Sequence, residues 1–480
     1  MHNKSKINSR SQHLYKHFDE DFVNVKFKPE VQNKIMKYQV IHVLNLISML
    51  KKDNEICCVD FSLTGTGKTY TSLAVCSQME LNPIIICPKS AICYWKEICD
   101  FFCVIPKTII NYESIKNGKE LTDELKKKKS DIIEIKYDEE DSDGEEKKKE
   151  RYIWKKESID KNKNIIIFDE AHRCKNHKTQ NGKLLMSAKG VCRILLLSAT
   201  ISQKYEDFKI FGYMLGFYKR IADGSKWIKN LLREEKFRFK HDGETMLTKK
   251  LYPTKGSRMS YSDMDQYVKQ NHVSTQCYTL DQKDIIAIEN YYDTLEKYDE
   301  GHLAKQIHTR QKIEEIKLKI IIDLAEKYLD QGLSVVIFVN YLESLNILKK
   351  YLDKHRIVSS IIFGKQTLEE RDENIKAFQN NVNKIIICMI QAGSESISLH
   401  DTDGGFPRVA LISPSYSGLE LVQALGRIYR TGVKSRVEQK IIFCDCKIER
   451  RMSEKISSKV KFLNNFADYD KLNPEDFSIK

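Results

Sequence analysis

The chain of 480 residues lacks any long apolar run. No stretch reaches the roughly 18 consecutive apolar residues that a membrane-spanning helix needs, so we expect no membrane partner. Residues 1–28 are polar and lack the apolar centre of a secretory signal peptide. The 13 cysteines include no CxxC pair, the spacing typical of zinc ribbons, and most of them lie within apolar segments. These absences predict a soluble, intracellular protein of a reducing compartment.

The chain is rich in charge. It has 80 Lys and Arg residues against 67 Asp and Glu residues, which gives a net charge of +13, and 41% of its residues are hydrophobic. This hydrophobic content suffices for two or three domains with real cores and excludes global disorder. The positive balance suits a polyanion such as nucleic acid, although many proteins with other partners are equally basic.

A glycine-containing loop follows the first apolar run. Residues 56–59 predict a buried strand, residues 62–69 read SLTGTGKT, and a helical pattern comes next. Strand, loop and helix in this order predict a loop whose backbone N–H groups bind phosphate. Lys68 would neutralise phosphate charge, and Thr69 would place its hydroxyl on Mg²⁺. The general pattern has glycine at its first position, where this chain has Ser62, so the loop alone is also compatible with a structural turn.

A second strand-like run ends in two acids. Residues 164–168, in which three isoleucines and a phenylalanine follow Asn164, lead directly to Asp169 and Glu170, at the end of a strand where parallel sheets bind ligands. Asp169 is expected to hold Mg²⁺, and Glu170 to orient or deprotonate the attacking water. Because His172 has no evident metal partner, we assign it to coupling rather than to metal binding. A solvated acidic turn is the alternative.

Further strand-like runs follow. One of them ends in residues 198–200, Ser-Ala-Thr, whose hydroxyl groups could connect a nucleotide site to a nucleic-acid site or simply form a turn. From residue 334 onward, apolar runs alternate with helical patterns and predict a second parallel α/β unit. Arg427 and Arg430 are three residues apart and would share one face of a helix. Two guanidinium groups facing one way suit the charge on a γ-phosphate, with a basic surface helix as the alternative.

The composition along the chain predicts five segments. They are a flexible N-terminal arm (residues 1–29), a first lobe (30–220) with a charged, disordered insert (116–160), a linker or small subdomain (221–310), a second lobe (311–446), and a basic C-terminal helix and tail (447–480).

The ordered motifs, from about Tyr38 to Arg430, resemble the motor core of superfamily 2 helicases and translocases. Residues 87–90, 169–176 and 423–432 are similar to motifs of the Swi2/Snf2 branch, and residues 169–172 spell DEAH. Serines at 394 and 396, in place of the usual glycines, add to a mixture that resembles the helicases of large cytoplasmic DNA viruses, such as the poxvirus transcript-release type.

This resemblance implies an α/β fold of two tandem RecA-like parallel-sheet lobes with an ATP cleft between them, and it implies ATP and Mg²⁺ as cofactors. It assigns nucleotide contacts to Gln39, Thr64, Gly65, Thr66, Gly67, Lys68, Thr69 and Gln423, metal contacts to Thr69 and Asp169, and catalysis to Lys68, Glu170, Arg427 and Arg430. It assigns nucleic-acid contacts to Lys89, Ser90, Thr200, Asn340 and Ser394, and coupling to His172 and Ser198.

The expected function is ATP-driven movement on nucleic acid, DNA rather than RNA, in viral-type transcription (elongation, termination or transcript release) or DNA remodelling. An RNA polymerase or a transcription factor is a possible partner, and a viral protein would act in the host cytoplasm or the virion. One alternative is an RNA helicase. Another is a nucleotide-switched clamp on DNA or polymerase with little turnover, which Ser62, Ser394 and Ser396 favour and the intact catalytic residues oppose. A metabolic kinase would leave the second lobe unexplained.

Overall fold

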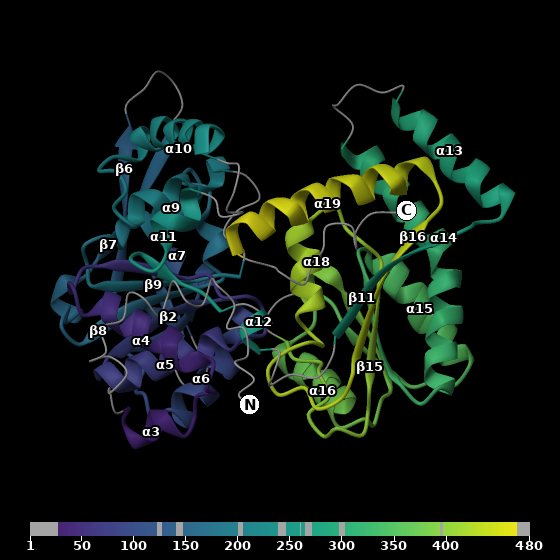
Figure 1. The fold of residues 1–480 in the computed structure, drawn as a ribbon, viewed down its shortest axis with the longest axis horizontal. Helices are drawn as coiled ribbons and strands as arrows, with labels where there is room; N and C mark the ends of the chain where they lie inside the picture. Colours follow the sequence, from purple (N-terminus) through teal and green to yellow (C-terminus); the bar gives the residue numbers. More distant parts are fainter. Residues whose placement is uncertain are drawn as a thin grey trace, which may run out of the picture. The chain divides into compact units, whose positions relative to one another are not determined.

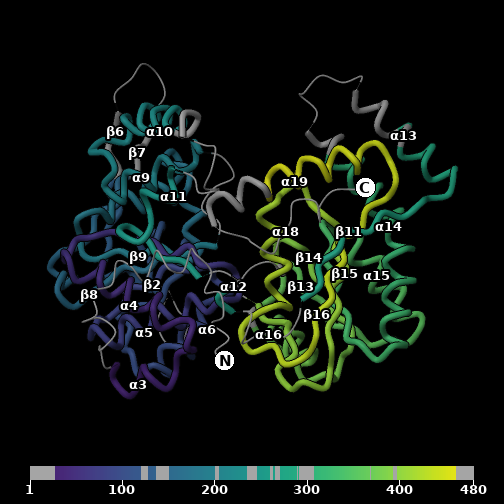
Figure 2. Tube along the Cα trace, viewed as in Figure 1, coloured from purple at the N-terminus to yellow at the C-terminus, as the bar shows by residue number. Residues whose placement is uncertain are grey.

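The computed structural model describes residues 27–121, 127–140, 147–199, 205–238, 246–259, 261–264, 271–296, 303–393 and 397–467. These residues belong to two compact units (Figures 1 and 2). Apart from the short stretches 64–66 and 465–468, the boundary between the units falls at Ser260 and Tyr261.

The first unit contains the following helices and strands in chain order. They are α3 (Pro29–Gln32), α4 (Gln39–Leu50), β1 (Cys57–Asp60), α5 (Lys68–Met79), β2 (Asn82–Cys87), η1 (Lys89–Ala91), α6 (Ile92–Phe101), β3 (Thr108–Asn111), α7 (Tyr112–Lys116), β4 (Lys119–Leu121), β5 (Lys127–Lys129), β6 (Ile133–Glu140), β7 (Lys147–Trp154), η2 (Lys156–Ser158), β8 (Asn164–Asp169), η3 (Ala171–Cys174), α8 (Gln180–Ser187), β9 (Arg193–Leu197), η4 (Tyr205–Phe208), α9 (Lys209–Met214), η5 (Ile221–Asp223), α10 (Gly224–Arg238), α11 (Met246–Leu251) and β10 (Gly256–Ser257).

The second unit contains α12 (Tyr261–Met264), β11 (Asn271–Tyr278), α13 (Gln282–Glu296), α14 (Leu303–Asp330), β12 (Ser334–Val339), α15 (Leu342–Lys354), β13 (Ser359–Ile362), α16 (Leu368–Gln379), β14 (Ile385–Met389), α17 (Ile390–Gly393), β15 (Arg408–Ile412), α18 (Gly418–Leu425), β16 (Val437–Cys444) and α19 (Lys447–Ala467).

The sheet of the first unit has six parallel strands in the order β10-β1-β9-β8-β2-β3. Strands β1 and β8 are separated only by β9, so their carboxyl ends lie about 10 Å apart along the same edge of the sheet. Because ligands of parallel α/β sheets bind at that edge, the topology brings the phosphate loop after β1 close to the acids that end β8.

The core of this unit explains why its strands are continuously apolar. Helices α4, α5 and α6 cover one face of the sheet, where Leu46, Leu73 and Trp95 pack in one cluster with Ile167 of β8 and Leu195 of β9. The other face is buried as well, so strand residues on both faces avoid water. Full burial of each such side chain contributes about 1.5–3 kcal/mol to the stability of the fold. The strands are therefore firmly held in the sheet, and so are their ends, which carry the site.

The second unit repeats this plan. Its six parallel strands run in the order β11-β16-β15-β12-β14-β13. Ile321 of α14 and Leu348 of α15 pack against Ile337, Ile387 and Leu411 on one face of the sheet, and Figure 1 shows α14 and α15 side by side there. The expected fold, two tandem parallel-sheet α/β units of the RecA-like type, is confirmed.

The charged segment 116–160 is more ordered than the sequence indicated. The structure describes two antiparallel hairpins here, β4–β5 and β6–β7, while residues 122–126 and 141–146 lie outside the described residues. Ile133 and Trp154 face each other in the β6–β7 register, and both are at most 5% exposed. The indole N–H of Trp154 also donates to Ser187 Oγ of α8 at 3.0 Å. The base of the hairpin is therefore apolar and anchored to α8. The charged runs on either side make this base hard to recognise in the sequence.

The expected linker at 221–310 also differs from the structure. It supplies an edge strand to each sheet, β10 beside β1 and β11 beside β16, together with α10, α11 and α13. Strand β10 has only two residues, and β11 is a half-exposed, polar edge strand. Neither therefore shows the apolar period that marks a buried strand. No helix in the described ranges combines the length and hydropathy needed to span a bilayer.

Candidate functional site

The phosphate loop has the backbone that its glycines predict. Strand β1 ends at Asp60, residues 64–66 form a turn, and α5 begins at Lys68. Gly65 and Gly67 have φ angles of +82° and +93°, in the left-handed region that glycine adopts without strain. The first N–H groups of α5 have no intrahelical acceptor, so the loop and helix together present a surface that favours an anion.

Gln39, the expected adenine contact, is the first residue of α4 and lies against this loop. An added Cβ at Gly67 would come 2.4 Å from Gln39 Nε2, so only glycine permits the close approach of loop and amide. The Gln39 side chain is 3% exposed, and its Oε1 accepts a hydrogen bond from Met36 N at 2.9 Å. The structure thus places Gln39 beside the phosphate loop, although the two are 28 positions apart in sequence.

Lys68 projects back over the loop. Its Nζ donates to Ser62 O at 2.9 Å and to Leu63 O at 3.0 Å. These two carbonyls hold the ammonium group against the start of the loop. A phosphate oxygen bound there would compete for the same ammonium group, as the sequence predicts for Lys68.

Asp60, beneath the loop, was not among the predicted site residues. It is fully buried and accepts from Ser62 N at 2.9 Å, while its Oδ2 lies 2.9 Å from His42 Nε2 of α4. Burial favours the neutral acid, but His42 and Lys68 outweigh it and hold the Asp60 pKa below its ordinary value. The buried Asp60 carboxylate thus supports the loop. The only sign of this role in the sequence is its position at the end of the strand that precedes the loop.

Asp169 ends β8 and is fixed by three neighbours. The indole N–H of Trp95, from α6, donates to Asp169 Oδ2 at 2.9 Å, and Glu170 N donates to Oδ1 at 3.0 Å. The Tyr112 hydroxyl donates to the Asp169 carbonyl at 2.8 Å. Burial and the neighbouring Glu170 raise the Asp169 pKa to about 6, although Trp95 and Lys68 pull it down. Two adjacent acids, of which Asp169 has a raised pKa because of its burial and its neighbour, form a place where a cation is favourable.

Glu170, His172 and Ser198 form one connected group, and the coupling role of His172 and Ser198 stays a prediction. His172 Nδ1 lies 3.3 Å from Glu170 Oε2 and 3.3 Å from Ser198 Oγ at the end of β9. Glu170 itself has a φ of +52°, an uncommon conformation for a residue with a side chain, which marks a locally strained backbone. The turn lies directly after β8, at the edge of the sheet that carries the phosphate loop.

The two arginines of the second unit lie in a turn and not on a helix. Helix α18 ends at Leu425, and Gly426 caps it, so the expected shared helical face is wrong. The guanidinium groups still converge, because Nη1 of Arg427 donates to Ile397 O at 3.2 Å and Nη1 of Arg430 donates to the same oxygen at 2.9 Å. Arg430 also contacts Ser398 Oγ.

Gln423 of α18 is 4% exposed. Within the described part of the chain, its Nε2 has no hydrogen-bond acceptor. A buried amide of this kind is costly unless something else satisfies it, which agrees with its assignment as a ligand contact.

The predicted nucleic-acid contacts fall into three groups. Lys89 is exposed and Ser90 half-buried on η1, directly after β2 at the same edge of the first sheet as the phosphate loop. Thr200 and Ser394 lie outside the described residues. Asn340, after β12, is described, and its surroundings differ from the expectation.

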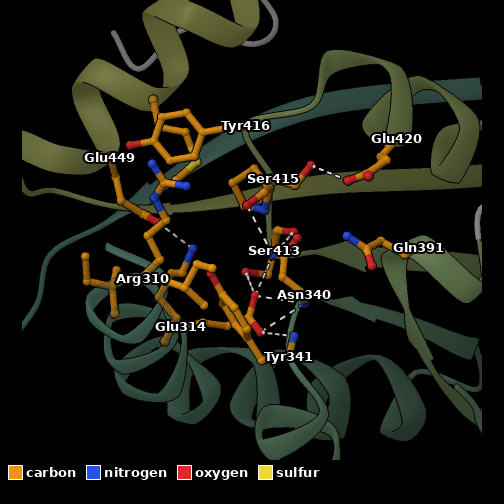
Figure 3. A pocket seen from close by; sticks show the side chains of 15 residues that line it. Arg310, Glu314, Asn340, Tyr341, Gln391, Ser413, Ser415, Tyr416, Glu420 and Glu449 are labelled. Atoms are coloured by element: carbon orange, nitrogen blue, oxygen red, sulfur yellow. Dashed lines mark hydrogen bonds and ion pairs between the residues drawn. The ribbon is translucent and has the colours of Figure 1, made fainter. Parts of the chain in front are cut away.

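The side-chain amide of Asn340 is hydrogen-bonded to other residues of the second unit. Its Nδ2 donates to Glu314 Oε2 at 2.6 Å and to the carbonyls of Ser413 and Pro414 at 3.2 and 3.3 Å. Figure 3 shows this group at the bottom of a cavity of about 360 Å³, with Arg310 beside Tyr416 above it. Asn340 thus holds the buried Glu314 in place, and these contacts engage its amide nitrogen. The sequence could not show this, because Glu314 lies 26 residues earlier on α14.

Comparisons with known proteins agree with this geometry. Two family models match, the res subunit of type III restriction enzymes over residues 32–203 and the helicase conserved C-terminal domain over residues 316–432. A protein of Acanthamoeba polyphaga mimivirus that carries the name of an ATP-dependent RNA helicase is 36% identical over 479 residues, 94% of this chain and 86% of that protein.

More distant similarities are to a chromatin regulator, to a SWI2/SNF2 ATPase core and to Dbp5. The chain is 23% identical to the human SWI/SNF-related matrix-associated actin-dependent regulator of chromatin subfamily A member 1, over 62% of this chain but only 31% of the human protein. The Sulfolobus solfataricus SWI2/SNF2 ATPase core in complex with duplex DNA is 16% identical, with 87% of this chain and 90% of that chain covered at a TM-score of 0.36. Dbp5 of S. cerevisiae, bound to RNA and ADP BeF3, is 13% identical, with 95% and 98% covered at a TM-score of 0.49.

The chain belongs to the superfamily 2 helicases. It has a viral relative, and its similarity to a SWI/SNF-related protein is the distant one given above. The family hydrolyses ATP with a divalent metal ion, so the chain is an ATP hydrolase of this kind. The oxygen atoms of Thr69 and Asp169 suit a hard divalent cation, which agrees with the raised Asp169 pKa.

Proposed function

We propose that this protein is a nucleic-acid motor that couples ATP hydrolysis to movement along DNA. The observation that carries the proposal is the assembly of Lys68, Asp169 and Glu170 at one edge of the first sheet. Lys68 lies close enough to Asp169 to lower its pKa, and Glu170 is connected through His172 to Ser198. A phosphate-binding lysine, a metal-binding acid and a water-orienting acid are the parts that ATP hydrolysis requires.

In this proposal each residue has a defined role. Lys68 and the loop N–H groups bind the phosphates, and Gln39 recognises adenine. Thr69 and Asp169 hold Mg²⁺, which would neutralise phosphate charge during the reaction. Glu170 accepts a proton from the attacking water or orients it, and His172 fixes the Glu170 carboxylate. Ser198 transmits changes in the contact between Glu170 and His172 to the residues that contact nucleic acid.

We assign the arginines of the second unit to the γ-phosphate. Arg427 and Arg430 converge on the carbonyl of Ile397, so both guanidinium groups occupy one small region. Two fixed cations of this kind stabilise the charge that develops in the transition state. Arg430 is less buried than Arg427, so Arg430 is the better placed to change partners when ATP is present.

DNA is the proposed track, and Lys89 and Ser90 are the proposed backbone contacts of the first unit. Support comes from the Snf2-like relatives, one of which is named as a chromatin regulator. The name of the mimivirus relative favours RNA as the second candidate. A role in viral-type transcription, with a polymerase as partner, is the setting we propose on the same resemblance.

Three experiments test the proposal. Displacement of a triplex-forming strand measures movement on duplex DNA, and an unwinding assay on RNA duplexes tests the second candidate. We expect ATP-dependent displacement by the wild type and none by Lys68→Ala. Nucleic-acid binding should weaken steeply with salt, because contacts to phosphates release counterions. Tight, salt-independent binding without turnover would instead support the nucleotide-switched clamp.

A further inference from the structure

Ser62 stands where the general phosphate-loop pattern has glycine, and the structure shows each of its polar atoms in use. Its N–H donates to Asp60 Oδ1 at 2.9 Å, and its carbonyl accepts from Lys68 Nζ at 2.9 Å. Its hydroxyl oxygen accepts from Met259 N at 2.8 Å, and the residue is 0% exposed. Glycine would supply the first two contacts but not the third.

Met259 belongs to the last segment of the first unit. The ladder between β1 and β10 continues beyond both strands, because Phe61 N donates to Ser257 O and Leu63 N donates to Met259 O, each at 3.0 Å. At Met259 N the acceptor is a side-chain oxygen, that of Ser62, as β1 gives way to the loop. Residues 255–259 are thereby hydrogen-bonded along the end of β1 and onto the first two residues of the phosphate loop, which Met259 contacts. The second unit begins two residues after Met259.

Ser62 and Leu63 therefore have two sets of partners. Their carbonyls accept from Lys68 Nζ, at 2.9 and 3.0 Å, while Ser62 Oγ and Leu63 N pair with Met259. A phosphate that draws the Lys68 ammonium group away removes two hydrogen bonds from this short stretch of main chain. Any resulting shift of residues 62–63 is passed to Met259 through both of its hydrogen bonds.

We infer that Ser62 is a positioning residue that makes residues 255–259 respond to the occupancy of the phosphate loop. The inference rests on the proposed binding of ATP at this loop and adds a route by which that binding reaches the end of the first unit. It also gives the departure from glycine a role, in place of degeneration of the motif. The hydroxyl is required because the Met259 N–H is buried, and a buried donor without an acceptor is unfavourable.

The test is hydrogen–deuterium exchange of the peptide covering residues 255–259, with and without ADP–beryllium fluoride. Ser62→Ala and Ser62→Gly remove the hydroxyl, whereas Ser62→Thr keeps it. In the wild type and in Ser62→Thr we expect the exchange rate of this peptide to change about fivefold when nucleotide is added. A change of this size corresponds to the free energy of about one hydrogen bond. In Ser62→Ala and Ser62→Gly we expect less than half of that response. Strand β3, at the other edge of the sheet, should not respond in any variant.

Binding of a fluorescent ATP analogue, measured separately, distinguishes the possible failures. If the wild type does not bind the analogue, the proposed function is wrong and the inference falls with it. If the analogue binds but residues 255–259 do not respond in the wild type, or respond equally in Ser62→Ala, the inference alone is wrong. Should Ser62→Ala and Ser62→Gly fail to fold, the comparison of residues 255–259 with β3 in the wild type and in Ser62→Thr still tests the inference, and a response no larger than that of β3 would overturn it.

Discussion

Replacing Trp95 with Phe tests how Asp169 is held. The Trp95 ring is fully buried on α6, and its Nε1 donates to Asp169 Oδ2 at 2.9 Å. Phenylalanine occupies most of the same space but has no N–H, so the substitution removes the donor and leaves a small cavity. The bond from Glu170 N to the other carboxylate oxygen, at 3.0 Å, remains.

Two effects set the size of the expected change. A hydrogen bond to a charged group is worth about 1.5–3 kcal/mol, and the cavity adds about 1 kcal/mol, so the free energy of unfolding should fall by about 2–4 kcal/mol. The Trp95 hydrogen bond lowers the Asp169 pKa, and its loss raises that pKa further. Because a proton then competes better with the metal and the carboxylate is less fixed, the Mg²⁺ concentration for half-maximal ATPase should rise about tenfold.

The assays are urea unfolding and Mg²⁺ titration of steady-state ATPase at pH 7. Tyr112→Phe is the matched control, because the Tyr112 hydroxyl donates to the Asp169 main-chain carbonyl and not to the carboxylate. It should cost about 1 kcal/mol of stability and change the Mg²⁺ requirement by less than about twofold. An unchanged Mg²⁺ requirement in Trp95→Phe, with the fold intact, would refute the reasoning.

Three further predictions concern pH, the arginines and a buried ion pair. The Asp169 pKa is raised to about 6, so the folded state binds more protons than the unfolded state between roughly pH 4 and 6, and the contribution of Asp169 to stability falls as the pH rises through that window. Mg²⁺ titrations at pH 5.5 and 7.5 should accordingly show weaker binding at the lower pH, a difference that Asp169→Asn abolishes. Arg427→Ala should lower ATP turnover about 10³-fold while a fluorescent ATP analogue still binds, and normal turnover would exclude the proposed role. Lys317 and Glu449 are each at most 2% exposed with Nζ and Oε1 2.6 Å apart, so Lys317→Met should cost about 3–5 kcal/mol in urea unfolding, and a Glu449→Leu change added to it should recover part of that loss.

The buried parallel strands could be predicted from the sequence because both of their faces are covered. Residues 165–168 and 335–339 are continuous apolar runs, and each is a central strand in the structure. The edge strands β10 and β11 could not be predicted, because a two-residue strand has no period and a half-exposed strand tolerates polar residues.

The spacing of residues along the sequence also led to a wrong prediction where a helix ends earlier than expected. Arg427 and Arg430 were placed on a helix by their separation, but Gly426 before them is a residue type that commonly ends helices. Their convergence on Ile397 O depends on tertiary structure that spacing does not contain. The hydrogen bonds of Asn340 to Glu314 and of Trp95 to Asp169 are equally long-range contacts, and neither has a separate signal in the sequence.

The most direct test of the proposed motor is steady-state ATP hydrolysis in four conditions, without nucleic acid and with single-stranded DNA, duplex DNA or RNA. Glu170→Gln is the matched control, since it keeps the shape of the side chain but removes the carboxylate that orients water. We predict hydrolysis that DNA stimulates in the wild type and that Glu170→Gln lacks although it binds ATP. Stimulation by RNA alone would indicate that the motor moves on RNA and not on DNA. ATP binding without hydrolysis in any condition would contradict the motor and favour the clamp.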